Sequence, residues 1–119
     1  MKISLIITTI NKPNNIMRNY SKLCKKKLIN FYVIGDKKSP KDFKLEGCKF
    51  YNFKDQTKLS FNYSKVCIAN SYVRKNIGYL IAIKNKTDLI IETDDDNHPK
   101  NNFFSNLNYN QKYLIIKNK

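Results

Sequence analysis

The sequence of 119 residues contains no tryptophan, one histidine, three glycines and three prolines. So little glycine and proline argues against a loop-rich or fibrous protein. No apolar stretch approaches the roughly 20 residues that a membrane-spanning helix needs. The first apolar run, residues 3–10, is too short for a signal peptide and includes Thr8 and Thr9. We therefore expect a soluble chain that forms a single domain around one core.

The cysteines are few and widely spaced. Cys24, Cys48 and Cys67 are odd in number and lack the close spacing of a zinc or redox motif. We interpret them as small apolar residues in a reducing compartment, which predicts a cytoplasmic protein.

Acidic residues are also scarce, with 9 against 23 lysines and arginines and a formal net charge of +14. Such a charge attracts phosphate in nucleic acids, nucleotides or anionic lipids. One hypothesis is therefore a small basic nucleic-acid-binding protein that stacks bases on its tyrosines and phenylalanines. The alternative is a solvated lysine surface, because the lysines are spread along the chain and only residues 25–27 form a run.

Apolar runs alternate with helical periodicity. Residues 3–10 and 31–34 are predicted to be strands, the first of them buried on both faces, with a helix from Ile16 to Cys24 between them. The remaining predictions are a loop at 37–48, a short strand near 50–53, a helix from Ser64 or Ser71 to Lys84, a strand at 89–93, a helix after Pro99 and a strand at 113–116. Residues 54–63 have no readable pattern. This alternation predicts an α/β fold, a mostly parallel sheet with helices on both faces.

Polar residues directly follow three of the predicted strands. The three groups are Thr8, Thr9 and Asn11 after the first strand, Asp36, Lys37 and Lys38 after the second, and Asp94, Asp95 and Asp96 after the third. Ligands of open parallel sheets bind beyond the carboxyl ends of the strands. If the three strands are neighbours, these groups converge on one crevice.

The acidic run is the most informative of the three groups, because four of the nine acidic residues fall within residues 92–96. Adjacent carboxylates repel one another unless water or a cation relieves the repulsion. Their hard oxygen atoms select Mg²⁺ or Mn²⁺. Strand alternation predicts that Asp94 and Asp96 share a side as metal ligands while Asp95 faces away. The alternative is a solvated turn that caps the following helix.

Other candidates are isolated residues. Asp36 can accept a hydrogen bond from a ribose hydroxyl or a uracil N–H, or it can simply form a turn after Gly35. Arg74, one of two arginines, suits bidentate phosphate binding unless it is a surface residue. His98 is a candidate metal ligand or a solvated side chain. Gly78, within a helical pattern, indicates close approach of another backbone or a ligand.

Together these segments resemble the GT-A glycosyltransferases, in which an Asn-x-Gly helix precedes the strand with the D-x-D motif. The chain is most similar to the STELLO-type family of glycosyltransferases. The resemblance extends over about residues 3–104, and it rests on Gly35–Pro40, Tyr72–Ile83 and Glu92–Asn97 of this sequence.

This resemblance implies a GT-A fold that transfers a sugar from a nucleoside-diphosphate sugar, with UDP as the nucleotide, to an unidentified acceptor. It implies that Thr8, Thr9 and Asn11 border the nucleotide and that Asp36 and Lys37 bind it. Arg74, Lys75 and Asn76 would face the diphosphate or sugar. Asp94 and Asp95 would lie near ribose and sugar, and Asp96 would bind Mn²⁺ or Mg²⁺. In this family the acceptor half and the catalytic base follow the D-x-D motif. We therefore expect the chain to be one partial GT-A domain, the donor-binding half. A non-catalytic nucleotide-binding interaction module is the remaining hypothesis.

Overall fold

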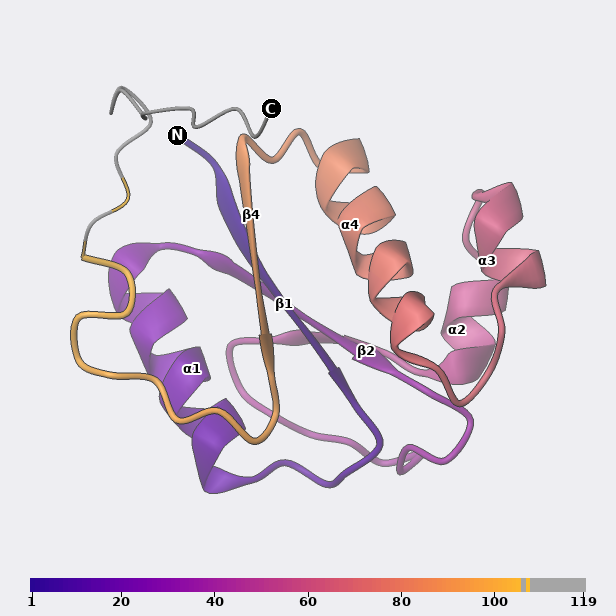
Figure 1. Cartoon of the computed structure of the whole chain (residues 1–119), viewed down its shortest axis with the longest axis horizontal. Helices are drawn as coiled ribbons and strands as arrows, with labels where there is room; N and C mark the ends of the chain where they lie inside the picture. Colours follow the sequence, from indigo (N-terminus) through magenta and orange to yellow (C-terminus); the bar gives the residue numbers. More distant parts are fainter. Residues whose placement is uncertain (106, 108–119) are drawn as a thin grey trace, which may run out of the picture.

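The computed structural model describes residues 1–105 and 107, which form a four-stranded parallel sheet flanked by helices (Figure 1). The strands are β1 (Ile3–Thr9), β2 (Asn30–Gly35), β3 (Lys49–Tyr51) and β4 (Leu89–Asp94). The helices are α1 (Asn15–Lys27), α2 (Phe53–Thr57), α3 (Asn62–Val66), the 3₁₀ helix η1 (Tyr72–Arg74) and α4 (Lys75–Lys84). The strand order β3-β2-β1-β4 confirms the predicted α/β fold, which is compatible with part of a GT-A domain.

Strand β1 lies between β2 and β4 and is buried along most of its length, as its apolar run predicts. Thr8 is paired with Asp94 and Thr9 with Gly35, so the three strands end at the same level. The three predicted groups of polar residues therefore follow neighbouring strands, as their convergence on one crevice requires.

Helices cover both faces of the sheet. Successive side chains of β1 point to opposite sides, so they pack against helices on each face. Leu5 and Ile7 belong to one core cluster, which includes Met17 of α1. Ile6 belongs to a second cluster, which includes Ile77 of α4. The continuous apolar run of a buried parallel strand thus supplies both cores.

Gly78 allows α4 to lie directly on the sheet. A Cβ atom at this position would lie 2.6 Å from Ile6 Cγ2 and 3.1 Å from Ile34 Cγ1. The close approach predicted from this glycine is therefore made by side chains of β1 and β2.

Side-chain caps define where α1 and η1 begin. Asn14 accepts a 2.8 Å hydrogen bond from the backbone N–H of Met17 and so caps α1. Ser71 accepts from the backbone N–H of Val73, so the helical segment that ends at Lys84 starts after Ser71, with η1 as its first turn.

Two regions differ from the sequence expectation. The helix predicted after Pro99 is wrong over residues 101–105, which form turns. Phe103 packs edge-on against Tyr20 with ring centroids 5.3 Å apart, so its apolar side chain serves the core without helical backbone. The unreadable region at 54–63 contains most of α2 and the start of α3, and the strand predicted at 113–116 lies outside the described residues.

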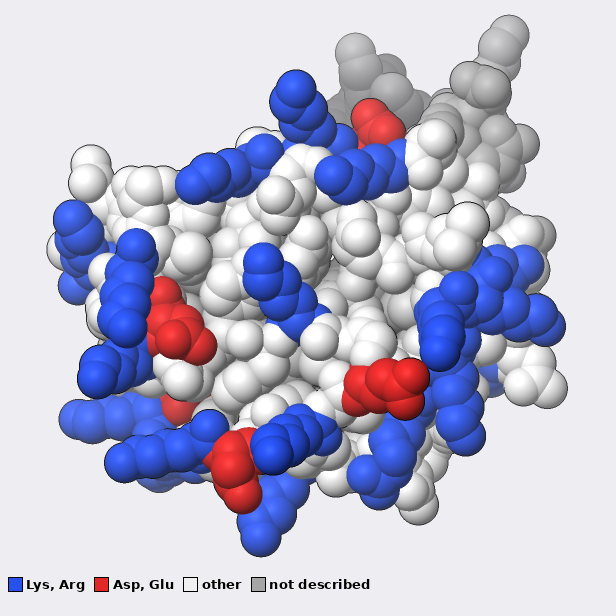
Figure 2. All heavy atoms as spheres, turned by 180° about the vertical axis from the view of Figure 1, so that it is seen from behind, with Lys and Arg blue, Asp and Glu red and all other residues white. Residues whose placement is uncertain are grey.

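The lysine side chains lie mainly at the surface. On the face shown in Figure 2 the lysine and arginine side chains lie mainly toward the periphery, in separate groups. The run at residues 25–27 is the last turn of α1, where cations interact favourably with the helix dipole. Within residues 1–105 and 107, no helix has both the length and the apolar character needed to cross a membrane.

Candidate functional site

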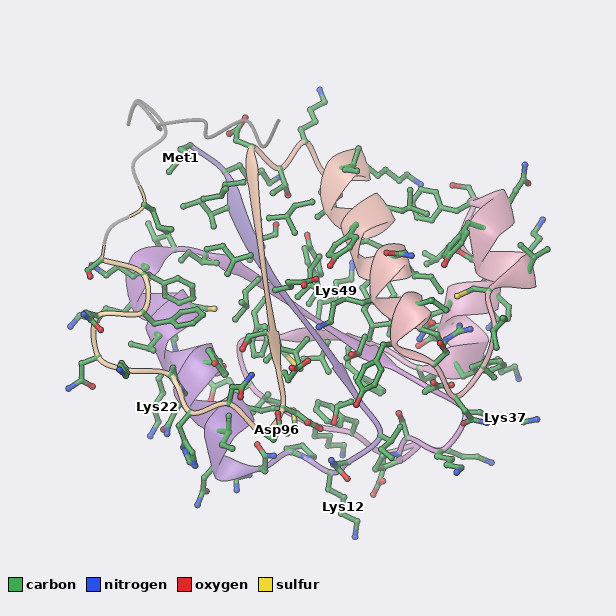
Figure 3. All side chains as sticks on the ribbon, in the orientation of Figure 1. Met1, Lys12, Lys22, Lys37, Lys49 and Asp96 are labelled. Atoms are coloured by element: carbon green, nitrogen blue, oxygen red, sulfur yellow. The ribbon has the colours of Figure 1, made fainter. Side chains whose placement is uncertain are left out.

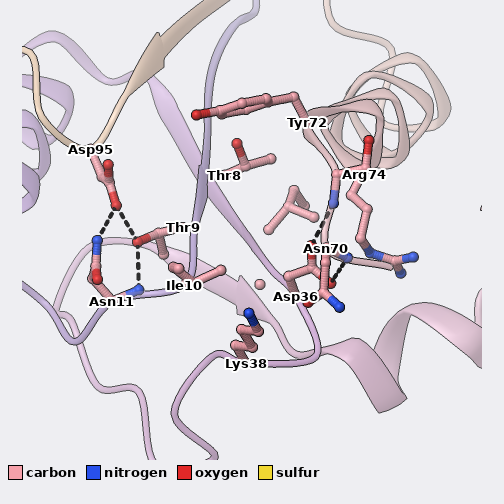
Figure 4. Close-up of a pocket in the computed structure, with 13 residues that line it drawn as sticks. Thr8, Thr9, Ile10, Asn11, Asp36, Lys38, Asn70, Tyr72, Arg74 and Asp95 are labelled. Carbon is pink, nitrogen blue, oxygen red and sulfur yellow. Dashed lines mark hydrogen bonds between the residues drawn. The ribbon is translucent and has the colours of Figure 1, made fainter. Parts of the chain in front are cut away.

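The strand order places a crevice between β1 and β4. From β1 the chain adds β2 and then β3 on one side, and it returns to place β4 on the other side. Such a reversal is where open parallel sheets bind ligands, beyond the carboxyl ends of the strands. A cavity of about 380 Å³ opens beside this crevice, over the carboxyl ends of β1 and β2, and is bounded by Asp95 after β4 and by the segment around η1 (Figure 4).

The structure brings together six of the predicted site residues around this first cavity. They are Thr8, Thr9, Asn11, Asp36, Arg74 and Asp95. A second cavity, shallow and open to solvent, is lined by three more predicted residues: Lys75, Asn76 and Asp94. Tyr72 lines both cavities, so they adjoin at this residue.

Three predicted residues line neither cavity. Lys37 points away from the molecule (Figure 3), and its neighbour Lys38 borders the first cavity instead. Asp96 lies at the end of β4 beside α1 and is exposed, as is His98.

Asp95 joins the end of β4 to the loop after β1. Its Oδ2 atom accepts hydrogen bonds from the Thr9 hydroxyl at 2.6 Å and the Asn11 amide at 2.9 Å. Its backbone carbonyl accepts from the Asn14 side chain, which also caps α1. This one residue therefore connects β4, the β1 loop and the start of α1.

Ser39 joins the loop after β2 to β1. Its hydroxyl donates to the Thr9 carbonyl at 2.7 Å and accepts from the Asp36 backbone N–H at 2.7 Å. Hydrogen bonds thus run from Asp95 through Thr9 and Ser39 to Asp36, across the ends of three strands.

Asp36 extends this rim to the segment before η1. Its Oδ1 accepts from the backbone N–H groups of Lys37 at 2.6 Å and Asn70 at 2.8 Å, and its Oδ2 accepts from Ser71 N–H at 3.1 Å. These bonds hold Asn70 at a positive φ of 55°. Each carboxylate oxygen can accept about two hydrogen bonds. Within the described contacts, Oδ2 therefore keeps one acceptor position for a ligand.

Arg74 is 1% exposed, which rules out the surface role considered from the sequence. Its guanidinium donates to Gln56 Oε1 through Nε at 3.0 Å and through Nη2, and to the Cys67 carbonyl at 3.0 Å. It also lies over the Phe53 ring, with Cζ 4.4 Å from the centroid. These contacts direct most of its donors into the protein and leave it at the cavity wall as a positive charge.

Gln56 completes this buried connection. It is fully buried, and its amide nitrogen donates to the carbonyls of Gly35 at 2.7 Å and Tyr51 at 2.9 Å. Because its oxygen accepts from Arg74, Gln56 links the ends of β2 and β3 to η1.

Asp94 and Asp95, neighbours in the acidic run, have different partners. Asp94 Oδ1 lies 3.2 Å from Lys75 Nζ, and Asp95 faces Thr9. No hydrogen bond or ion pair to Asp96 is found among residues 1–105 and 107. The repulsion noted from the sequence is thus partly relieved by the protein's own donors.

Tyr20 fixes the loop that carries the acidic run. Its hydroxyl donates to the Asn97 carbonyl at 2.7 Å and lies 3.1 Å from Thr93 Oγ1. Burial raises the pKa of Tyr20 above 10.0; the hydrogen bond to Thr93 opposes this shift and the charge of Asp94 adds to it. Tyr20 therefore remains a neutral donor at physiological pH.

The donor chemistry of this region suits a hard divalent cation, since carboxylate oxygens are the ligands that Mg²⁺ and Mn²⁺ prefer. The described part of the chain contains no group of three or more histidine, cysteine or acidic residues placed to hold a metal ion. Asp94 and Asp96 have the right type of ligand atom for such an ion, but phosphate and water oxygens must complete its coordination.

Several residues of the site could not be identified from the sequence. Gln56 lies in the unreadable segment, and Asn70 and Ser71 contribute backbone N–H groups that no side-chain pattern reveals. Ser39 and Tyr72 lie within the segments that carry the family resemblance, although no role was predicted for either.

Comparison with known proteins supports that resemblance. The chain is 35% identical over 63 residues to each of two proteins of Arabidopsis thaliana, named "Probable glycosyltransferase STELLO2" and "Probable glycosyltransferase STELLO1". Each match covers 53% of this chain and 8% of the relative. No family model matches the chain. The predicted similarity to STELLO-type proteins is confirmed, while the chain corresponds to a small part of their length.

Proposed function

We propose that this chain is the nucleotide-sugar-binding part of a metal-dependent glycosyltransferase. The donor is a nucleoside-diphosphate sugar with UDP as the nucleotide, and the cation is Mn²⁺ or Mg²⁺. The observation that carries the proposal is the first cavity, where the ends of β1, β2 and β4 are joined by the hydrogen bonds of Thr9.

The cavity has the size and chemistry of a small-ligand site. Its volume of about 380 Å³ falls within the roughly 300–1,000 Å³ typical of such sites. Its walls combine apolar surface from Ile10 with polar groups on Thr8 and Asp36. Because hydrogen bonds hold its rim, little ordering is needed when a ligand binds, which favours affinity.

Each polar group has a proposed role. Thr8 and Thr9 border the nucleotide base, and Asp36 uses the remaining acceptor position of Oδ2 for an N–H or O–H of the nucleoside. Arg74 acts on the diphosphate through its charge, and Lys75 faces the diphosphate from the second cavity, beside Asp94 near the ribose and sugar.

Asp94 and Asp96 are the residues that would hold the cation. A divalent ion held by them would neutralise the charge that develops on a departing diphosphate. In this proposal the chain itself binds and orients the donor, and the group that activates the acceptor comes from elsewhere.

Calorimetric titration with UDP in the presence of Mn²⁺ tests the proposal. We expect the wild-type chain to bind UDP and Asp96→Ala to lose at least tenfold in affinity. Asp42→Ala, at an exposed position away from the cavities, makes the same charge change and should bind normally. Absence of UDP binding by the wild-type chain, or equal binding by Asp96→Ala, would refute the metal-dependent site.

A further inference from the structure

Lys75 occupies an unusual position for a cationic side chain. It is the first residue of α4 and directly follows the 3₁₀ turn η1, so it lies on the second turn of one continuous helical segment. Its side chain is only 12% exposed, so water screens its charge weakly. A lysine in this position needs an anionic partner.

Asp94 is that partner. Lys75 Nζ lies 3.2 Å from Asp94 Oδ1 and also contacts the Thr93 carbonyl at 3.5 Å. The Asp94 side chain is 49% exposed and borders the second cavity together with Lys75. The ammonium group therefore neutralises a carboxylate that a ligand in this cavity can reach.

Glu92 also borders the second cavity, but the ion pair of Lys75 within the described residues is with Asp94. Asp95 directs Oδ2 to Thr9 and Asn11, and Asp96 is exposed at the end of the strand. A divalent cation approaching the empty protein must compete with the Lys75 ammonium for Asp94. A diphosphate in the second cavity supplies a new anion for Lys75 and leaves Asp94 to the metal.

We propose that Lys75 is a competing internal cation that makes metal binding depend on the diphosphate. The inference rests on the proposed function, because it concerns the same metal and nucleotide. Lys75 pairs with Asp94 in the absence of nucleotide and with phosphate in its presence. The coupling is reciprocal, so each ligand strengthens the binding of the other.

Binding of Mn²⁺ alone, followed by the loss of the electron paramagnetic resonance signal of the free ion, tests this role. Wild-type protein should bind Mn²⁺ weakly, and Lys75→Met should bind it about tenfold more tightly, a change typical of coupling between sites. With Mn²⁺ saturating, Lys75→Met should bind UDP more weakly than wild type. Asp94→Asn combined with Lys75→Met should lose the gain in Mn²⁺ affinity.

Lys84→Met is the matched control. Lys84 is the last residue of the same helix and contacts Ser60 and the Phe61 ring, so the variant makes the same change in net charge away from Asp94. We expect its Mn²⁺ affinity to equal that of wild type. Equal tightening in Lys84→Met would overturn the specific role of Lys75.

Two further results separate this inference from the proposed function. Equal Mn²⁺ affinity of wild type and Lys75→Met, or no binding by either, overturns the role of Lys75 even if UDP binds. Tighter Mn²⁺ binding by Lys75→Met supports it even if UDP does not bind. If Lys75→Met does not fold, Lys75→Gln provides the same comparison, because it also removes the charge.

Discussion

The Thr9 hydroxyl donates a 2.6 Å hydrogen bond to the Asp95 carboxylate, across 86 residues of sequence. The same hydroxyl accepts from the Asn11 backbone N–H at 3.0 Å, so it orders the β1 loop from both sides. Thr9 is 5% exposed and borders the first cavity. The shape of this cavity therefore depends on a contact between its two flanking strands.

Thr9→Val should weaken both the fold and UDP binding. Valine has a similar shape but no hydroxyl, so the Asn11 N–H and one position on Asp95 lose their partner. Because both hydrogen bonds are only partly buried, water replaces part of the loss, and we expect a cost of about 1 kcal/mol. Urea denaturation measures the loss of unfolding free energy, and calorimetry measures the weaker binding of UDP with Mn²⁺.

Thr57→Val is the control for this prediction. Thr57 is exposed at the end of α2 and donates only to the Lys54 carbonyl within the described contacts. Its replacement should change the unfolding free energy by no more than about 0.5 kcal/mol. Equal effects at Thr9 and Thr57 would show that the bond to Asp95 contributes nothing specific.

The two arginines of the chain should differ sharply in their contribution to stability. Arg74→Met leaves acceptors on Gln56 and Cys67 without a donor, and each such buried group costs about 1–3 kcal/mol. We expect a loss of about 3 kcal/mol or more. Arg18→Met, on the exposed face of α1, should lose about 0.5 kcal/mol or less.

Chemical denaturation of both arginine variants measures this difference. If Arg74→Met retained wild-type stability but lost UDP binding, the guanidinium would be a phosphate ligand and its inward contacts would not support the fold.

Gly78→Ala should destabilise the protein even though alanine favours helices. The substitution gains about 1 kcal/mol of helix propensity. Its methyl group would meet Ile6 Cγ2 at 2.6 Å, and such overpacking typically costs about 1–3 kcal/mol. We expect a net loss in unfolding free energy, with Lys84→Ala at the exposed end of α4 as the control. A more stable Gly78→Ala would show that α4 can move away from the sheet at little cost.

The buried thiols should make stability decrease at high pH. Burial raises the pKa of Cys24 from 9.0 to about 12, with a smaller contribution from the charge of Cys48. Burial likewise raises the pKa of Cys48 from 9.0 to about 11. Above pH 9 the unfolded chain releases these protons while the folded chain keeps them, so the unfolding free energy falls as pH rises from 9 to 11.

Urea denaturation at pH 8 and pH 10.5 checks this pH dependence. The double variant Cys24→Ala and Cys48→Ala should show a smaller decrease than wild type over this interval. Between pH 6 and pH 8 the difference in stability between the two proteins should stay constant. A parallel decrease in both proteins above pH 9 would assign the effect to other groups.

The pattern of apolar and polar residues was sufficient to predict most of the fold. The apolar runs at 3–10 and 89–93 are the strands β1 and β4, and the helical spacing of residues 16–24 lies within α1. Residues 54–63 could not be predicted because α2 and α3 are too short to show a helical period. The wrong helix after Pro99 reflects apolar residues that pack from turns.

The sequence by itself determined the alternation of strands and helices and the concentration of polar residues after three strands. These are local properties, set by the spacing of apolar side chains and by turn-forming residues. Tertiary structure alone decided which donor each carboxylate meets. Asp94 and Lys75, like Arg74 and Gln56, are distant in sequence and meet only because the sheet orders its strands β3-β2-β1-β4. The same packing buries Arg74 and leaves Asp96 exposed, because burial depends on all neighbouring elements together.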